Sequence, residues 1–276
     1  MATGRKVLGL REKVHPTAHV SESARLAADV QVGAYTTIGP EVVIHEECVI
    51  GPHVTITGRT EIGPRTRIYA GGLIGVSDSG NPVIHAAGER LAGDAGELII
   101  GADNIIREYA LLRPGNPVTG PTRVGDGNFI MGHVYLGAGC RIGSGVIITQ
   151  ATHLEDSVTV EDGAVISGLS EIVSGVRIGQ LAMVGAVTCI TADIPPYLMV
   201  AGNPPQVHGI NVVGLRRHEI SPEDRSDLKR AFKTIYRTDQ TLTASIEELT
   251  SEFPHSTLVQ HLIEFLRQSR RGIFLQ

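Results

Sequence analysis

The sequence of 276 residues contains no tryptophan, and aromatic residues make up only 4% of it. Large rings usually fill wide hydrophobic cores, so their scarcity favours a thin core of aliphatic side chains. Glycine is abundant instead, with 33 residues. This composition is typical of a repeat protein with a narrow core and many tight corners.

Long apolar runs and an excess of positive charge are also missing. No stretch approaches the roughly 18 apolar residues of a membrane span, and the N-terminal segment MATGRKVLGLREK has no signal-peptide core. The formal net charge of −5 argues against non-specific nucleic-acid binding. We therefore expect a cytoplasmic protein with no membrane span and no nucleic-acid partner.

Cysteine is scarce and unpatterned. Cys48, Cys140 and Cys189 are spread over the chain, and no CxxC motif occurs. An odd number of scattered cysteines favours small core or corner fillers over disulfides or zinc ligands. We expect no metal and no cofactor.

Aliphatic residues recur at every sixth position from Val124 to Ile190. Such a period fits neither a helix nor an ordinary strand, and it is typical of a β-solenoid, the left-handed parallel β-helix. Each hexad makes one flat strand and a corner, and three hexads make one triangular coil. Ordinary strands, the alternative, would have to hold this phase through every turn by chance. The twelve residues are Val124, Ile130, Leu136, Ile142, Ile148, Leu154, Val160, Ile166, Ile172, Ile178, Val184 and Ile190.

The same phase runs from Val14 to Ile74 and resumes from Ile100 to Leu112. It breaks twice, at residues 76–97 (the first excursion) and at residues 113–122 (the second excursion). Loops of such length inside a compact repeat are usually functional or disordered. We interpret the first excursion as a loop that folds over a neighbouring surface, a tolerated insertion being the alternative. The β-helix is predicted to cover residues 1–213.

From Gly214 the pattern becomes helical, which predicts a helical domain over residues 214–276. Ser221 is placed as an N-cap with Pro222 at the first helical position, a second helix is predicted to stop at Pro254, and a third to start near Ser256. Seven basic residues fall within 22 positions that include the first helix, and a basic first helix suits an acidic partner such as a carrier protein, while a solvated face is the alternative. The basic residues are Arg216, Arg217, Arg225, Lys229, Arg230, Lys233 and Arg237.

Five short segments lie on this hexapeptide and helical framework. They are ValHisProThrAla (14–18), AsnIleIleArgGlu (104–108), AspIleProProTyr (193–197), GlyIleAsnValValGlyLeuArgArg (209–217) and SerArgArgGly (269–272). With the two excursions, they make the chain similar, nearly end to end, to the UDP-N-acetylglucosamine O-acyltransferase (LpxA) family of lipid A synthesis.

The resemblance implies a homotrimer with active sites in the clefts between barrels, and no metal. It implies transfer of a 3-hydroxyacyl chain from acyl carrier protein to a nucleotide-linked sugar, with a histidine as general base and an adjacent aspartate supporting it. The substrate-binding positions that it suggests are Asn104, Arg107, Tyr135, Asn203, Arg216 and Arg217.

The chain departs from the family at the chemical residues. Over residues 128–140 it aligns with the family motif without gaps, yet the base position is Ala138, its acidic neighbour is Gly139, and the first family histidine is Tyr135. Alanine cannot accept a proton, and loss of a general base typically costs ~10² to 10⁴ in rate. Further departures are Ser157 for a histidine and Val173-Ser174 for a His-Gln pair.

Three functions remain open. The chain is an acyltransferase with another base, for which His133 and His153 are the candidates, or with a more nucleophilic acceptor such as a sugar amine. Alternatively, both histidines are corner residues bonded to backbone, and the chain is a catalytically silent paralogue that binds a nucleotide sugar, a carrier protein or an enzyme partner. A metal hydrolyase like the β-helical carbonic anhydrases is the third, but the spacing of the early histidines does not match that family.

Overall fold

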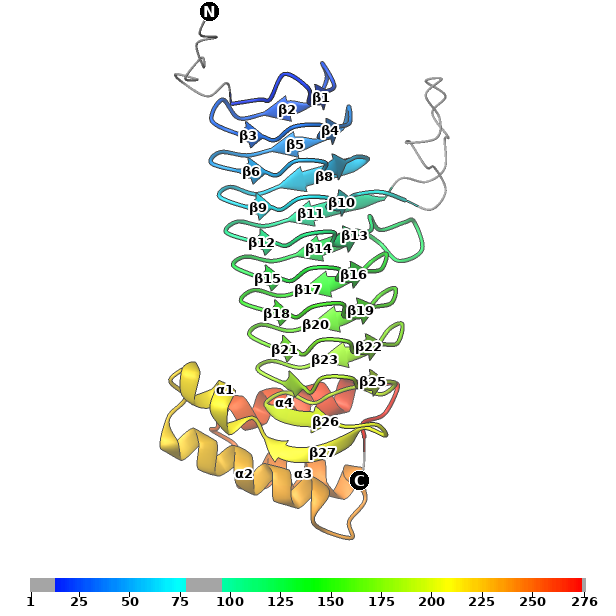
Figure 1. Cartoon of the computed structure of the whole chain (residues 1–276). Helices are drawn as coiled ribbons and strands as arrows, with labels where there is room; N and C mark the ends of the chain where they lie inside the picture. Colours follow the sequence, from blue (N-terminus) through cyan, green and yellow to red (C-terminus); the bar gives the residue numbers. More distant parts are fainter. Residues whose placement is uncertain (1–12, 78–95, 275–276) are drawn as a thin grey trace, which may run out of the picture.

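The computed structural model describes residues 13–77 and 96–274, and its largest part is a three-sided coil (Figure 1). Strands pair in parallel with the strand three places later in the chain, so successive strands lie on successive sides. Neighbouring rungs of one side are three hexads apart in the sequence, as Tyr135 and His153 are. The predicted hexapeptide repeat is therefore confirmed.

The strands of the described residues form three sheets. The first sheet contains β1 (His19–Val20), β4 (Thr37–Ile38), β7 (Thr55–Ile56), β10 (Leu73–Ile74), β13 (Leu111–Leu112), β16 (Tyr135–Leu136), β19 (His153–Leu154), β22 (Glu171–Ile172) and β25 (Cys189–Ile190). The second sheet contains β2 (Arg25–Leu26), β5 (Val43–Ile44), β8 (Arg59–Ile62), β11 (Glu97–Ile100), β14 (Thr122–Val124), β17 (Arg141–Ile142), β20 (Thr159–Val160) and β23 (Arg177–Ile178). The third sheet contains β3 (Gln31–Val32), β6 (Val49–Ile50), β9 (Arg67–Ile68), β12 (Ile105–Ile106), β15 (Phe129–Ile130), β18 (Ile147–Ile148), β21 (Val165–Ile166), β24 (Met183–Val184), β26 (Leu198–Ala201) and β27 (Gln206–Ile210), of which the last two pair antiparallel.

The last residue of each two-residue strand is the more deeply buried one. Ile38, Ile56 and Ile74 are fully buried on the first sheet, whereas Thr37 and Leu73, which precede two of them, are exposed. One aliphatic side chain per hexad thus fills the axis, and each contributes about 1.5–3 kcal/mol by burial.

Both excursions interrupt the coil between rungs. Leu73 pairs with Leu111 across the first excursion, and Leu111 pairs with Tyr135 across the second. Each pair is separated by more than three hexads, so the coil continues in register above and below each excursion. Most of the first excursion lies outside the described residues. The second is held by Asn116, whose Oδ1 accepts hydrogen bonds from the backbone N–H groups of Val118 and Thr119, both at 2.9 Å.

Helices α1 (Val212–Arg217), α2 (Pro222–Tyr236), α3 (Leu242–Glu252) and α4 (Thr257–Gln268) follow β27 and cover the end of the coil (Figure 1). The predicted helical C-terminal region is confirmed. Ser221 caps α2, since its Oγ accepts a hydrogen bond from the Asp224 N–H at 3.0 Å. Helix α1 was not predicted, and the expected boundary between residues 213 and 214 falls inside it. Within the described ranges, every helix is too short or too polar to cross a membrane.

Candidate functional site

A small hollow on the outer face of the first sheet gathers polar and aromatic side chains. It has a volume of 260 Å³ and is lined by Tyr135, His153, Glu155, Asp156 and Ser174. We call it the His153 pocket. Tyr135 and His153 open the neighbouring strands β16 and β19 and are partners in register. Their rings therefore lie against each other in a tilted arrangement, with centroids 4.3 Å apart and an angle of 32° between the planes.

The polar rim of the His153 pocket comes from the corners that follow β19 and β22. Asp156 accepts a hydrogen bond from the Ala138 N–H at 2.7 Å, and Glu155 accepts one from the Ser174 N–H at 2.9 Å. The Ser174 hydroxyl donates to the Asp156 carbonyl at 2.7 Å. These bonds between rungs hold the two carboxylates in place.

The His153 imidazole is exposed, and within residues 13–77 and 96–274 it forms no hydrogen bond or ion pair. Its Tyr135 neighbour is held by Arg113, which donates from Nη1 to the phenol oxygen at 3.0 Å. A general base needs an accessible nitrogen at a fixed place. His153 has the accessible nitrogen, its ring lies against Tyr135, and of the two predicted catalytic histidines it is the one in the pocket.

His133 lies elsewhere, at a corner between the third and first sheets. Its backbone is left-handed with φ of 58°, and its N–H donates to the Glu108 carbonyl at 2.9 Å. Its ring stacks on Tyr109, with centroids 5.3 Å apart. It does not line the His153 pocket, so this position fits the corner role that we weighed as the alternative.

The family's base position is closed in this chain. Ala138 is only 2% exposed. The backbone N–H of Gly139 donates to the Thr122 hydroxyl at 2.8 Å, and its φ is 72°. A Cβ atom on Gly139 would overlap the Cβ of Thr119 in the second excursion, because the two would lie closer than the 3.0 Å that real Cβ atoms keep from their neighbours. The second excursion therefore occupies the space that an acidic side chain at position 139 would need.

Asn104 and Arg107, two of the predicted substrate contacts, both have partners within the chain, and their substrate roles stay predictions. Asn104 is fully buried inside the coil, where its amide donates to the carbonyls of Gly101 and Gly125 at 2.9 and 2.8 Å. Arg107 pairs with Glu108 at 3.0 Å, and the hydrogen bond from the guanidinium lowers the pKa of the Glu108 carboxyl. Asn104 thus stabilises the corner, and Arg107 belongs to the ion pair.

Three of the other predicted substrate contacts are exposed and lie outside the His153 pocket. Asn203 precedes the cis bond to Pro204 in the turn between β26 and β27. Arg216 and Arg217 lie in the last turn of α1. Their roles stay predictions. Tyr135 is the one predicted substrate contact that lines the pocket.

A larger hollow, with a volume of 810 Å³, lies where α4 meets the last rungs of the coil. We call it the arginine groove. Arg271 joins it to the His153 pocket, because its guanidinium donates to the carbonyl of Ser174, which lines that pocket. The groove is lined by Gly175, Arg177, Asp193, Arg267, Gln268, Arg270 and Arg271.

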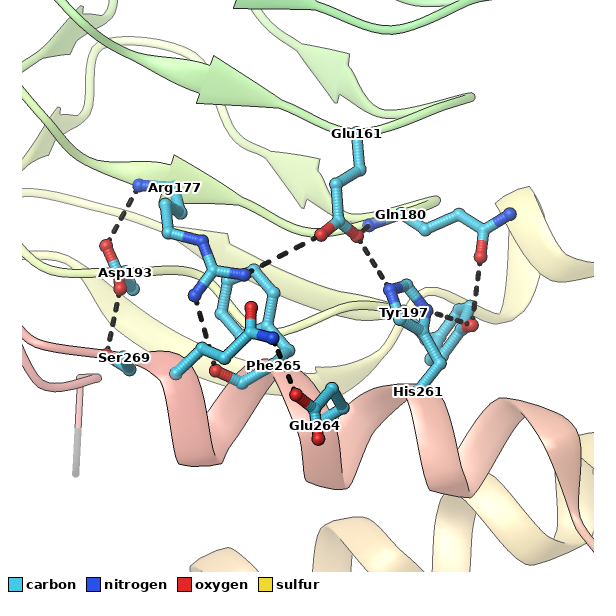
Figure 2. Close-up of polar contacts among 10 residues, drawn as sticks. Glu161, Arg177, Gln180, Asp193, Tyr197, His261, Glu264, Phe265 and Ser269 are labelled. Atoms are coloured by element: carbon cyan, nitrogen blue, oxygen red, sulfur yellow. Dashed lines mark hydrogen bonds and ion pairs between the residues drawn. The ribbon is translucent and has the colours of Figure 1, made fainter.

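A polar network fixes α4 against the coil beside this groove (Figure 2). His261 of α4 lies between two coil residues, with Nε2 at 3.1 Å from Glu161 and Nδ1 at 2.8 Å from the Tyr197 hydroxyl. Burial raises the pKa of Tyr197, so the phenol stays protonated. Arg177 stacks on Phe265, its guanidinium carbon 4.1 Å from the ring centre.

The sequence did not lead us to Glu155, Asp156 or Arg113, and it marked Ser174 only as a departure from the family's His-Gln pair. The hexad spacing could have predicted two of these residues, because residues three hexads apart lie next to each other on neighbouring rungs. Asp156 follows Ala138 by three hexads, and Ser174 follows Asp156 by another three. Among the described residues, no three His, Cys, Asp or Glu side chains are grouped as metal ligands would be.

Comparisons with known proteins agree with this architecture. Residues 23–58 match the bacterial transferase hexapeptide model, and residues 193–274 match the second domain of UDP-N-acetylglucosamine O-acyltransferase. The acyl-[acyl-carrier-protein]–UDP-N-acetylglucosamine O-acyltransferase of Thiobacillus denitrificans is 37% identical over 94% of this chain and 98% of its own length. The enzyme of the same name from Alkalilimnicola ehrlichii is 39% identical over 67% of this chain and 72% of its own length.

Solved structures give the same result. LpxA from Acinetobacter baumannii superposes with a TM-score of 0.87 and 31% identity, covering 96% of this chain and all of that one. The Francisella novicida UDP-N-acetylglucosamine acyltransferase superposes with a TM-score of 0.81 and 30% identity, over 95% and 94% of the two chains. The chain belongs to the UDP-N-acetylglucosamine O-acyltransferase (LpxA) family.

Proposed function

We propose that this chain is an acyltransferase of lipid A synthesis that moves a 3-hydroxyacyl group from acyl carrier protein to a nucleotide-linked amino sugar. The observation that carries this proposal is the His153 pocket. The pocket holds the accessible imidazole of His153. Beside it lies Tyr135, which occupies the position of the first family histidine on the same face of the coil. The relatives' names supply the donor and acceptor classes.

In the proposed reaction the His153 imidazole removes a proton from the acceptor as the acceptor attacks the thioester carbonyl. A new ester or amide bond forms, the carbon–sulfur bond breaks, and the thiolate takes the proton from the imidazolium. Tyr135 acts as a positioning residue, because its ring lies against the imidazole and its hydroxyl is itself held by Arg113. A correctly placed base contributes about 10² to 10⁴ in rate.

A second candidate is the catalytically silent paralogue. Two features favour it. The family base is replaced by the buried Ala138, and at Gly139 the chain leaves no room for the side chain of the acidic partner. Such a protein would keep binding to a nucleotide sugar or carrier protein without turnover.

A turnover assay separates the two candidates. The purified protein is offered UDP-N-acetylglucosamine or its 3-amino analogue, each with 3-hydroxyacyl carrier proteins of several chain lengths. We expect turnover that falls about 10² to 10⁴-fold in His153→Ala and stays unchanged in the matched variant His133→Ala. Binding without turnover for every substrate pair would support the silent paralogue and overturn the proposed chemistry.

The finer architecture is also a proposal. We propose that the coil is left-handed, that the helical region forms a second domain packed on its end, and that three chains assemble side by side in the cytoplasm. Support for assembly comes from the outer face of the third sheet, where apolar side chains follow one another up the rungs. They are Ile105, Phe129, Ile147, Val165 and Met183.

A further inference from the structure

The arginine groove concentrates positive charge in a chain whose formal net charge is −5. Four arginines line it, and the one acid is Asp193. That acid is directed inward, since Asp193 is only 1% exposed. Its carboxylate accepts hydrogen bonds from the backbone N–H of Arg177 at 2.9 Å and from the Ser269 hydroxyl at 2.8 Å.

Two of the four arginines are engaged in holding the fold. Arg271 donates to the backbone carbonyls of Ser174 and Thr191, and Arg177 stacks on Phe265 (Figure 2). The acceptors of Arg271 are neutral carbonyls, so its charge is not paired with an acid there. Arg177 has an acidic partner in Glu161, at 3.9 Å, but Glu161 is shared with His261.

The other two arginines are exposed. Arg267 donates to the Thr250 hydroxyl at 3.1 Å, and the Arg270 side chain forms no hydrogen bond or ion pair within the described part of the chain. A guanidinium presents its N–H groups as a planar fork that matches phosphate oxygens and binds them in pairs. Arg267 and Arg270 therefore offer donor groups at the rim of a positively charged hollow.

We propose that the arginine groove binds the phosphate ester of a substrate whose reacting end lies in the adjoining His153 pocket. The volume of 810 Å³ is that of a small-molecule site, and Arg271 links the groove to Ser174 at the pocket rim. The inference rests on the proposed function, whose donor and acceptor each carry phosphate and so give two sources for the bound group. One is the phosphodiester of the carrier's phosphopantetheine arm, and the other is the diphosphate of the nucleotide sugar.

Calorimetric titration of the full chain tests this proposal. Acyl-phosphopantetheine, phosphate-free acyl-pantetheine and UDP-N-acetylglucosamine are each titrated into the wild type and into the double variant Arg267→Gln/Arg270→Gln. We expect the variant to lose about tenfold or more in affinity for a phosphorylated ligand, with no change for acyl-pantetheine. The ligand that loses affinity identifies the source of the phosphate.

The matched control is Arg123→Gln/Arg141→Gln, which removes two exposed arginines from the second sheet. Equal affinities in the wild type and the groove variant would overturn the proposal. Intact acyl carrier protein is titrated as a fourth ligand, and a loss confined to it would also overturn the proposal, because the arginines would then contact its acidic surface.

A turnover assay with His153→Ala keeps the two hypotheses apart. If the wild type shows no turnover but the groove variant loses phosphate binding, the arginine groove is supported as a phosphate site and the proposed acyl transfer is rejected. If turnover depends on His153, and turnover and ligand affinity are both unchanged in the groove variant, the proposed acyl transfer is supported and the phosphate site is rejected.

Discussion

Gly139 and Thr119 determine what the family's catalytic corner can hold in this chain. We predict that the double variant Ala138→His/Gly139→Asp restores the family residues without raising turnover above that of the wild type. The backbone φ of 72° at Gly139 and the overlap of a Cβ with Thr119 should lower the free energy of unfolding by about 2 kcal/mol or more. Thermal unfolding and the turnover assay check both parts.

Gly145 provides the control for this experiment. It has a similar φ of 66°, but nothing lies within 4 Å of its Cβ position. Gly145→Asp therefore carries the backbone cost of about 1 kcal/mol without the clash. Equal destabilisation by Gly139→Asp and Gly145→Asp would show that Thr119 does not close the corner. Added turnover in the double variant would show that the space can open.

The placement of single residues was only partly predictable from the sequence. His153 follows Tyr135 by three hexads, so their contact on neighbouring rungs follows from the period alone. Asn104 was assigned to substrate by motif, although its amide serves as a bridge between the backbone carbonyls of two rungs. The Gly139 contact depends on the path of the second excursion, for which the sequence holds no periodic signal.

At the scale of elements, Asp193 ties the chain end that follows α4 to the coil. We predict that Asp193→Ala lowers the free energy of unfolding by about 3 kcal/mol, because it leaves the buried N–H of Arg177 and the hydroxyl of Ser269 without their charged acceptor. Denaturant unfolding measures the change, and proteolysis should cut the helical region sooner.

Ser269→Ala is the matched variant, since it removes one donor and leaves the carboxylate bonded to Arg177. Its expected cost is about 1 kcal/mol. If both variants unfold at the wild-type denaturant concentration, the hydrogen bonds of Asp193 do not contribute to the attachment of the helical region.

Regular elements were predicted better than irregular ones. The hexad period determined the strands because one buried aliphatic residue per hexad is a physical requirement of a narrow coil. Helix α2 was predictable from the Ser221 cap. Helix α1 is too short to show helical periodicity, and its Asn211 cap lies within the segment that leaves the coil. Contacts such as that of His261 with Glu161 join residues far apart in the sequence, so only the structure reveals them.

At the scale of the whole molecule, the outer faces of the sheets differ in character. The outward residues of the third sheet run Ile105, Phe129, Ile147 and Val165 on successive rungs, all partly exposed. On the second sheet, the outward positions of β17, β20 and β23 are Arg141, Thr159 and Arg177. A continuous apolar stripe on one face is typical of a protein–protein interface, and this asymmetry selects the face that a second copy of the chain would cover.

We therefore predict that Ile147→Glu converts the proposed trimer into monomers. A carboxylate at the middle of the stripe would be buried against apolar side chains of the neighbouring copy, where no partner charge compensates its desolvation. Thr159→Glu is the matched control, because it occupies the equivalent outward position on the second sheet and lies between two arginines in register. Sedimentation velocity should give a trimer for the wild type and for Thr159→Glu, and a monomer for Ile147→Glu. A trimer that survives Ile147→Glu would place the interface on another face, and the apolar stripe would then require a different partner.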